Sequence, residues 1–284
     1  MMLKPTRLLG AGCVLALGLA VAPAMAAAPV GVSGTIGGGY TNSSFDCSGC
    51  GHTDNWGFNG QAAFGFGSND LAGELNAGYL NSSPDCSGCD SFNTWGIGGA
   101  LFWSPDFGRI GGSVAWARTN IPASLSPFGS GGFDVDTVTY GALGEFFASD
   151  QFTLGGGLGG INISVPGGNA AAFYLSVGAT GYVMPDLGIT GAFQWADFDH
   201  GIGSVSALSI GAEWLVSEEI PVSIYGGYTR AFFPNGAPNA NVWNVGLKFY
   251  FGAEGMPLVG HHRNGALDSL TSINTTVLQE IFLF

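Results

Sequence analysis

Residues 56–66 read WGFNGQAAFGF, and large apolar side chains alternate with small or polar ones along this stretch. The positions of one parity are Trp56, Phe58, Gly60, Ala62, Phe64 and Phe66. Because successive side chains of a β-strand point to opposite faces, the stretch predicts a strand with one apolar face. Residues 71–79 and 243–251 show the same alternation. Such strands suit lipid on one side and a polar lumen on the other.

The composition is unusual for a soluble domain. The 284 residues include 50 glycines and 13% aromatic residues, but only 10% are charged, against roughly 25% in soluble domains. After the N-terminal 26 residues, the longest uncharged run is 151–185, and it contains several glycines together with Pro166, which disfavour a helix. Only helices and closed barrels satisfy every backbone group in lipid, so the composition favours a membrane-spanning β-barrel.

The N-terminus has the features of a secretory signal peptide, predicted to span residues 1–26. Lys4 and Arg7 precede an apolar core, and a small-x-small cleavage site ends at Ala26. A lipoprotein signal that uses Cys13 is the alternative, but Cys13 lies inside the apolar core. We expect the barrel to span 27–252 and a periplasmic C-terminal extension to span 253–284, with room for a short amphipathic helix near 266–281.

The period-2 pattern recurs in about twelve segments, within a range of roughly ten to fourteen. They lie at 30–40, 55–66, 71–80, 93–103, 109–119, 136–148, 152–163, 170–184, 187–198, 204–216, 221–232 and 241–251. Alternate connections are short, and the others, among them 41–54, 81–92 and 164–169, tend to be longer. Short periplasmic turns and longer outer loops are typical of bacterial outer-membrane barrels. The predicted fold is all-β, a transmembrane antiparallel up-and-down β-barrel.

The seven tryptophans all fall near the ends of these segments. This position suits a membrane interface, where the apolar ring meets lipid and the N–H meets water. A secreted β-sandwich or β-helix would explain the alternation, but it would explain neither the scarcity of charge nor this placement. The predicted interface girdle is Trp56, Trp95, Trp116, Trp195 and Trp243 at the outer ends, with Trp103 and Trp214 at the inner ends.

Residues 241–251, NVWNVGLKFYF, resemble the final strand of Gram-negative outer-membrane proteins, whose alternating apolar residues serve as the signal for barrel insertion. The matching positions are Trp243, Val245, Leu247, Phe249 and Phe251. The mature region is similar in style to the porin family of outer-membrane β-barrels. The resemblance implies a place in the bacterial outer membrane, with lipid, lipopolysaccharide and the barrel-insertion machinery as partners. In most members the signal strand ends the chain, whereas here 33 residues follow it.

Two similar loops hold the four cysteines of the predicted mature chain. Residues 40–58, YTNSSFDCSGCGHTDNWGF, match residues 79–97, YLNSSPDCSGCDSFNTWGI, and the cysteines are Cys47, Cys50, Cys86 and Cys89. Paired CxxC motifs indicate zinc in a reducing compartment, but disulfides persist outside the cytosol. We therefore predict disulfides, within each loop or between the two loops. A metal or redox site, with His52 and nearby aspartates as further ligands, is the alternative.

Few ionisable residues fall on the predicted lumen face: Glu74, Glu145, Glu213 and Lys248, with Arg109 at the rim. Such charges either line a water-filled path, which would prefer cations here, or pair into an internal cluster that stabilises a closed barrel. The net charge of −13 disfavours binding to nucleic acid, which requires lysine and arginine.

No catalytic motif stands out, because His200, His261 and His262 are isolated or in the tail. We therefore expect no enzyme and no cofactor. The predicted function is a porin-like channel for passive diffusion of small hydrophilic, cationic solutes. The alternative is a non-conducting structural or surface-recognition barrel with disulfide-stapled outer loops.

Overall fold

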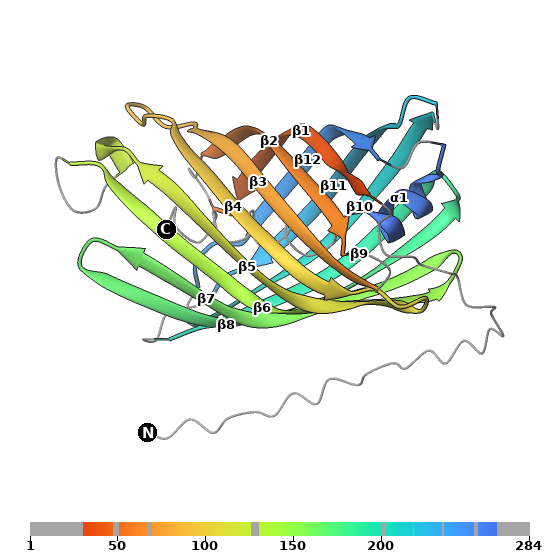
Figure 1. Ribbon diagram of the computed structural model, residues 1–284. Coiled ribbons are helices and arrows are strands. Elements are labelled where there is room, and N and C mark those ends of the chain that lie inside the picture. The colour runs from red at the N-terminus through yellow and green to blue at the C-terminus, as the bar shows by residue number, and fades with distance from the viewer. Residues whose placement is uncertain are drawn as a thin grey trace, which may run out of the picture.

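The computed structural model describes residues 31–47, 51–66, 70–125, 131–199, 203–217, 219–234, 236–252 and 255–265. Twelve strands form one closed antiparallel barrel, in which each strand pairs with its sequence neighbours and β12 pairs with β1 (Figure 1). The predicted fold class and strand number are therefore confirmed. The predicted signal peptide and residues 266–284 lie outside the described residues.

The strands are 11 to 17 residues long. They are β1 (Val32–Phe45), β2 (His52–Gly65), β3 (Leu71–Pro84), β4 (Phe92–Trp103), β5 (Gly108–Ile121), β6 (Phe133–Ser149), β7 (Phe152–Val165), β8 (Gly168–Met184), β9 (Leu187–Phe198), β10 (Gly203–Ser217), β11 (Val222–Phe232) and β12 (Ala240–Phe251). The described residues also form a 3-10 turn, η1 (Ala123–Leu125), and a helix, α1 (Leu258–Asn264). No helix among them is long and apolar enough to cross a membrane.

Several hairpins extend further than the sequence pattern predicted. Residues 41–54 were expected to be a loop, but Ser44 pairs with His52, so that β1 and β2 continue almost to the Cys47 region. The predicted loop 164–169 is wrong for the same reason, because β7 and β8 join through a two-residue turn with Gly167 at a φ of 95°. The polar residues that ended the apolar pattern are tolerated in these strands because backbone pairing does not require apolar side chains.

The outer face of the barrel carries a continuous apolar band. Every strand contributes at least one large exposed apolar or aromatic side chain to it, namely Ile36, Phe58, Leu75, Ile97, Val114, Tyr140, Leu158, Val177, Ile189, Ile210, Ile224 and Leu247. Monomeric soluble proteins rarely expose apolar patches of more than a few hundred Å². The band instead has the character of a surface that faces lipid.

The two ends of the barrel differ in their connections. We call the end with the β2–β3, β4–β5, β6–β7, β8–β9 and β10–β11 connections the short-turn end, and the opposite end the loop end. The β6–β7 and β8–β9 turns leave only two residues outside the strands, whereas η1 belongs to the longer β5–β6 connection at the loop end. β1 begins and β12 ends at the short-turn end, so this is also the end from which α1 starts.

Candidate functional site

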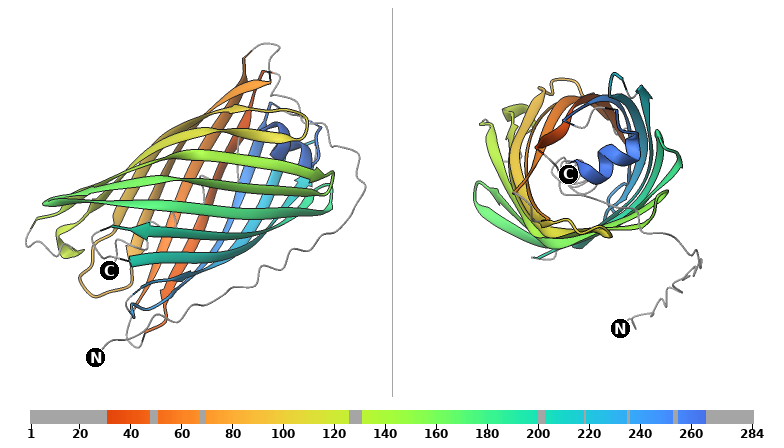
Figure 2. Two further views of the ribbon diagram at one scale, coloured as in Figure 1. Left: turned by 90° about the horizontal axis from the view of Figure 1, so that it is seen from below. Right: turned by 45° about the vertical axis from the view of Figure 1, so that its right-hand side comes forward.

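The helix α1 lies inside the barrel at the short-turn end. Seen along the barrel, α1 occupies part of the interior (Figure 2). After β12 the chain turns at Gly252, whose φ is 76°, and a Cβ there would lie 1.9 Å from the carbonyl oxygen of Val32. A side chain is therefore excluded at this position on both conformational and steric grounds. We call residues 255–265, which follow this turn, the plug segment.

An apolar contact holds one side of the plug segment to the barrel. Leu258 is fully buried and packs with Tyr182, Leu215 and Tyr250, which belong to β8, β10 and β12. The N–H of Val259 donates a hydrogen bond to the carbonyl oxygen of Pro185, in the β8–β9 turn, at 3.2 Å. Burial of a leucine side chain contributes roughly 1.5–3 kcal/mol, so this contact alone gives α1 a preferred position.

Arg109 ties the end of α1 to two strands. It lies in β5 directly opposite Glu145 of β6, and its Nε donates to Glu145 Oε2 at 2.8 Å. The same guanidinium donates to the carbonyl oxygens of Gly265 at 2.7 Å and of His262 at 2.6 Å. These carbonyls belong to the C-terminal end of α1, where the helix has unsatisfied acceptors and partial negative charge. One buried side chain thus completes both the ion pair and the helix end.

A second polar network lies on the other side of α1, around Glu213 of β10. Its carboxylate accepts from Lys248 Nζ at 2.9 Å and from the hydroxyl of Tyr250 at 2.5 Å. Nε2 of His262 lies 3.5 Å from the same carboxylate, and its Nδ1 is 2.9 Å from the hydroxyl of Tyr182. His262 therefore links α1 to β8, β10 and β12, so polar networks and the apolar contact of Leu258 together anchor the plug segment.

The five predicted lumen residues all lie on the inner face, and four of them form two ion pairs. Arg109 pairs with Glu145, and Lys248 pairs with Glu213. Glu74, on β3, accepts a hydrogen bond from Asn76 at 3.4 Å. Of the two alternatives for these charges, the geometry favours the paired internal cluster at the short-turn end. Their pairing leaves little reason to expect them to select permeating ions.

Sequence reasoning missed the part played by the histidines of the plug segment. The sequence places His261 and His262 in the C-terminal tail, yet His262 contacts Glu213, and the ring of His261 stacks on Tyr250 with centroids 4.4 Å apart. The sequence feature that could have indicated this role is the clustering of two histidines and Arg263 in a chain with only seven lysines and arginines. Arg263 donates to the carbonyl oxygen of Ser149 at the end of β6.

We expect docking of the plug segment to weaken as pH falls from about 6.5 to about 4. Burial, followed by the charge of His262, lowers the pKa of His261 to about 4, although Glu213 and Asp186 act in the opposite direction. The docked state therefore binds fewer protons than the undocked state in this window, and acid favours undocking, by at most about 3 kcal/mol. The midpoint of heat-modifiable gel migration, measured against pH, should fall across this range.

A His261→Phe variant is the control for this pH dependence. It keeps an aromatic ring on Tyr250 and removes the titrating group, so the part of the pH dependence due to His261 should disappear. An unchanged profile in the variant would mean that other groups are responsible.

The cysteine loops lie at the loop end. Cys86 and Cys89 form a disulfide within the second repeat. Cys47 is also disulfide-bonded, and Cys50 lies outside the described residues. Pairing within the loop is therefore established for the second repeat. Among the described residues, no three His, Cys, Asp or Glu side chains gather in a way that could hold a metal ion.

A backbone hydrogen bond and the contact between His52 and Asp85 link the two repeats. The N–H of Asp85 donates to the carbonyl oxygen of His52 at 2.7 Å. The imidazole of His52 lies 3.3 Å from the carboxylate of Asp85 and 3.6 Å from that of Asp54. All three side chains are well exposed, so these pairs contribute little to stability. Their arrangement makes one polar surface of the two loops.

Thiol labelling of intact cells should show Cys86 and Cys89 to be unreactive before reductant and reactive after it. The disulfide blocks both sulfurs, although Cys86 is exposed and would otherwise react. A membrane-impermeant maleimide, with the labelled peptide identified by mass spectrometry, provides the measurement. A Cys89→Ser variant is the positive control, because its freed Cys86 should label without reductant. Labelling of the unaltered chain before reduction would contradict the disulfide.

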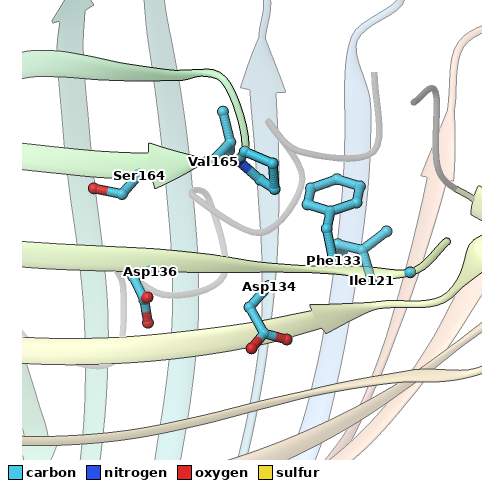
Figure 3. Close-up of a pocket in the computed structure, with 8 residues that line it drawn as sticks. Ile121, Phe133, Asp134, Asp136, Ser164 and Val165 are labelled. Carbon is cyan, nitrogen blue, oxygen red and sulfur yellow. The ribbon is translucent and has the colours of Figure 1, made fainter.

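A cavity of about 730 Å³ lies at the loop end between the β5–β6 connection and the β7–β8 turn. Asp134 and Asp136 of β6 and Ser164 of β7 line it (Figure 3). Its carboxylates are not free, because Arg118 donates to Asp136 at 2.8 Å and lies 3.6 Å from Asp134. The cavity therefore offers a paired, mixed-charge surface rather than a cation site or a catalytic group.

The predicted girdle tryptophans lie on the outer face. Trp56, Trp95, Trp103, Trp214 and Trp243 are well exposed. The other two are half-buried by neighbouring rings: Trp116 lies 4.7 Å from Trp95, centroid to centroid, and Trp195 lies 6.3 Å from Phe173. The rings therefore combine exposure at the barrel surface with edge-to-face aromatic contacts.

Several solved structures are similar to this barrel. The translocator domain of the autotransporter NalP from Neisseria meningitidis has a TM-score of 0.51 and 13% identity, covering 78% of this chain and 89% of that chain. The β-domain of the Bordetella autotransporter BrkA has a TM-score of 0.52 and 10% identity, covering 76% and 98%. The KdgM porin has a TM-score of 0.48 and 9% identity, covering 76% and 99%.

No protein-family profile and no curated protein sequence matches the chain. At identities this low, the first two structures show the fold alone. The chain therefore has the fold of the outer-membrane β-barrels, which confirms at the level of architecture the resemblance found in its last strand.

Proposed function

We propose that this protein is a passive channel of the bacterial outer membrane for small hydrophilic solutes, with cations favoured over anions, and that the plug segment narrows its periplasmic mouth. The observation that carries the proposal is the inner wall at mid-barrel. Its inward positions are almost all glycine or small uncharged polar residues, among them Gly37, Asn59, Asn76, Gly98, Ser113, Thr139, Gly157, Ser176, Ser209, Gly227 and Asn244. Small side chains take up little of the lumen, and hydroxyl and amide groups can form hydrogen bonds with water.

Hydrogen bonds between strands pair some of the polar groups of this wall without adding charge. Thr180 and Thr190 share one between β8 and β9 at 2.9 Å, and Ser209 and Thr229 share another between β10 and β11 at 2.9 Å. The inner ion pairs lie at the short-turn end and not along the middle of the lumen. Selection between cations and anions therefore depends on the long-range electrostatic field of the whole protein. A net charge of −13 attracts cations and repels anions.

Planar-bilayer recording of the purified, folded protein tests this function. We expect single-channel steps, and in asymmetric KCl a reversal potential of the sign that indicates preference for K⁺. Heat-modifiable migration of the same preparation must show that the barrel is folded. A folded barrel that gives no steps, either as the full chain or with the C-terminal residues removed, would overturn the proposal.

A second candidate is a non-conducting barrel whose cysteine loops form a recognition surface. The ion-paired anchoring of the plug segment inside the lumen favours it, because a permanently docked segment would obstruct flow. The same bilayer experiment separates the two candidates, since the folded full-length chain gives single-channel steps only if it is a channel.

A further inference from the structure

We propose that the Cys86–Cys89 disulfide is a redox-exchange site at the loop end of the folded barrel, and that small thiols with a positive charge are its preferred reductants. The disulfide then serves thiol exchange rather than the stability of the fold. The proposal goes beyond the channel function, because it concerns the chemistry of a surface loop whether or not the barrel conducts.

The first observation is how little of the chain this disulfide constrains. Cys86 and Cys89 are three residues apart in the sequence, and both lie in the connection between β3 and β4. A disulfide stabilises a fold mainly by restricting the unfolded chain, and the restriction grows with the length of the loop that it closes. A bridge between the two repeats would restrict a much longer stretch. Stability is therefore a weak reason for this particular bridge.

The second observation is that other contacts already hold this loop in place. The N–H of Cys89 donates to the carbonyl oxygen of Cys86 at 3.2 Å, and the N–H of Asp85 donates to the carbonyl oxygen of His52 at 2.7 Å. On the other side of the turn, the N–H of Asp90 donates to a serine hydroxyl of η1 at 2.9 Å. The turn should therefore keep its shape after reduction, with its two thiols close enough to form the bridge again.

The third observation is access to the sulfur atoms. Cys86, Ser87 and Gly88 are exposed, whereas Cys89 is half-buried. A Cβ placed on Gly88 would meet no atom within 4 Å, so there is open space beside the turn. Exchange requires a thiolate to reach one sulfur of the bridge, and exposed disulfides are the ones that exchange readily. We therefore expect an external thiol to attack Cys86.

The exchange is a balanced two-electron reaction. The thiolate of one small thiol attacks the sulfur of Cys86 and forms a mixed disulfide, while the bond to Cys89 breaks and leaves a thiolate that takes up a proton. A second small thiol attacks the small-molecule sulfur of this mixed disulfide. This step releases Cys86, which is protonated in turn, and yields the disulfide of the small thiol. Two electrons and two protons thus pass from the small thiols to the two cysteines.

The fourth observation is the charge beside the bridge, which decides the class of thiol. Asp85 precedes Cys86, Asp90 follows Cys89, and residues 84–91 contain no lysine or arginine. Both aspartates are exposed. His52, 3.3 Å from the carboxylate of Asp85, offsets this charge only when its imidazole is protonated, so the test belongs in mildly alkaline solution. The carboxylates repel anionic thiols and raise the local concentration of thiols that carry a positive amine.

Reduction of the folded barrel by two matched thiols tests the proposal. Cysteamine carries a positive amine, and mercaptoethanesulfonate carries a negative sulfonate on the same two-carbon chain. At equal thiolate concentration and low ionic strength, we expect cysteamine to reduce Cys86–Cys89 roughly fivefold faster, and salt to diminish this difference. Alkylation followed by peptide mapping measures these two thiols separately from Cys47. Heat-modifiable migration of the same samples must show that the barrel stays folded.

The chain denatured in urea provides the reference for accessibility. We expect the folded barrel to be reduced within about tenfold of the denatured chain, because no opening of the fold is needed to reach an exposed sulfur. Reduction of the folded barrel more than about a hundredfold slower than that of the denatured chain would mark a protected structural disulfide, and the proposal would be wrong. Equal rates for the two thiols in the folded barrel would overturn the assigned class of reductant.

A pair of double variants assigns the preference to the carboxylates beside the bridge. Asp85→Asn with Asp90→Asn removes both charges and keeps an acceptor oxygen at each position, so the preference for cysteamine should fall severalfold. Asp197→Asn with Asp199→Asn is the matched control, because it removes the same charge from exposed loop-end positions at β9 and just after it. The control should keep the preference. An equal loss in both double variants would attribute the preference to the net charge of the barrel and would overturn a local site.

Reoxidation of the reduced barrel gives a second, independent readout. Cystamine, the disulfide of cysteamine, should restore the bridge by the reverse of the two exchange steps, and the folded barrel should regain the Cys86–Cys89 pair. Peptide mapping of the reoxidised protein provides the measurement. Bridges from Cys86 or Cys89 to Cys47 in place of the original pair would show that the turn does not hold its two thiols together, and would contradict a reversible site.

Discussion

Replacing Arg109 with methionine should both undock the plug segment and destabilise the barrel by about 3–5 kcal/mol. The side chains of Arg109 and Glu145 are 2% and 5% exposed. Removing the guanidinium leaves the Glu145 carboxylate buried without its counter-charge. The carbonyl oxygens of His262 and Gly265 lose a charged donor in the same step. We therefore expect a lower midpoint of heat-modifiable migration and larger conductance steps.

Arg118→Met is a matched control, because Arg118 lies on the same strand and pairs with Asp136 directly opposite on β6. That pair is exposed, with 37% and 34% of the two side chains accessible, and exposed pairs contribute only about 0–1 kcal/mol. Its loss should leave the midpoint and the conductance nearly unchanged. Equal shifts of the midpoint in the two variants would show that burial does not increase the contribution of the Arg109–Glu145 pair to stability.

The double variant Arg109→Met with Glu145→Leu separates the two effects of Arg109. It removes the buried charge as well as its partner, so most of the stability should return. The plug segment should stay undocked, because the donor to its two carbonyl oxygens is still missing. Recovery of the midpoint with conductance still raised is the expected pattern.

The architecture could be predicted because the alternation of residues within each strand indicates which face of that strand is apolar. Trp56 to Phe66 alternates because one face meets lipid, and this condition recurs in every strand. The extents of the strands were less predictable. Ser44 and His52 carry no apolar signal, since they lie beyond the apolar band, and their pairing depends on the backbone alone. The apolar alternation thus marks the part of each strand that lies in the apolar band, and not the full length over which neighbouring strands are hydrogen-bonded.

The plug segment could not be predicted from local sequence, because its anchors are distant in the chain. Arg109 and Gly265 are separated by 156 residues and meet only when the barrel is closed. The sequence identifies the charged residues of the lumen. Whether these charges line a water-filled path or form ion pairs with each other depends on closure of the barrel. Arg109 and Glu145 are adjacent because β5 and β6 pair in a register that places them opposite each other. Here the decisive information is the register, which the alternation of apolar residues does not contain.

Ending the chain at Gly252 should give the largest conductance of any form of this protein. β12 ends at Phe251 and is paired along its length with β1 and β11, so the barrel closes without the later residues. The apolar residues from Trp243 to Phe251, which resemble the insertion signal, become the end of the chain. Removing α1 takes Leu258, His261 and His262 out of the lumen.

The chain ended at Gly252 should be more stable than the Arg109→Met variant, although both lack a docked plug segment. In the truncated chain Glu145 keeps its ion pair with Arg109, and Glu213 keeps its pair with Lys248. No buried charge is left without a partner, and the freed inner wall gains contact with water. The midpoint of heat-modifiable migration should therefore fall less than in Arg109→Met.

Two truncated chains test whether α1 obstructs the lumen. Conductance should be higher in the chain ended at Gly252 than in the chain ended at Gly265. A full-length Leu258→Asp variant should reproduce the effect of undocking α1 without shortening the chain, because a buried carboxylate among Tyr182, Leu215 and Tyr250 is unfavourable. If the chain ended at Gly252 conducts no more than the chain ended at Gly265, α1 does not obstruct the lumen, and its buried contacts serve only to stabilise the barrel.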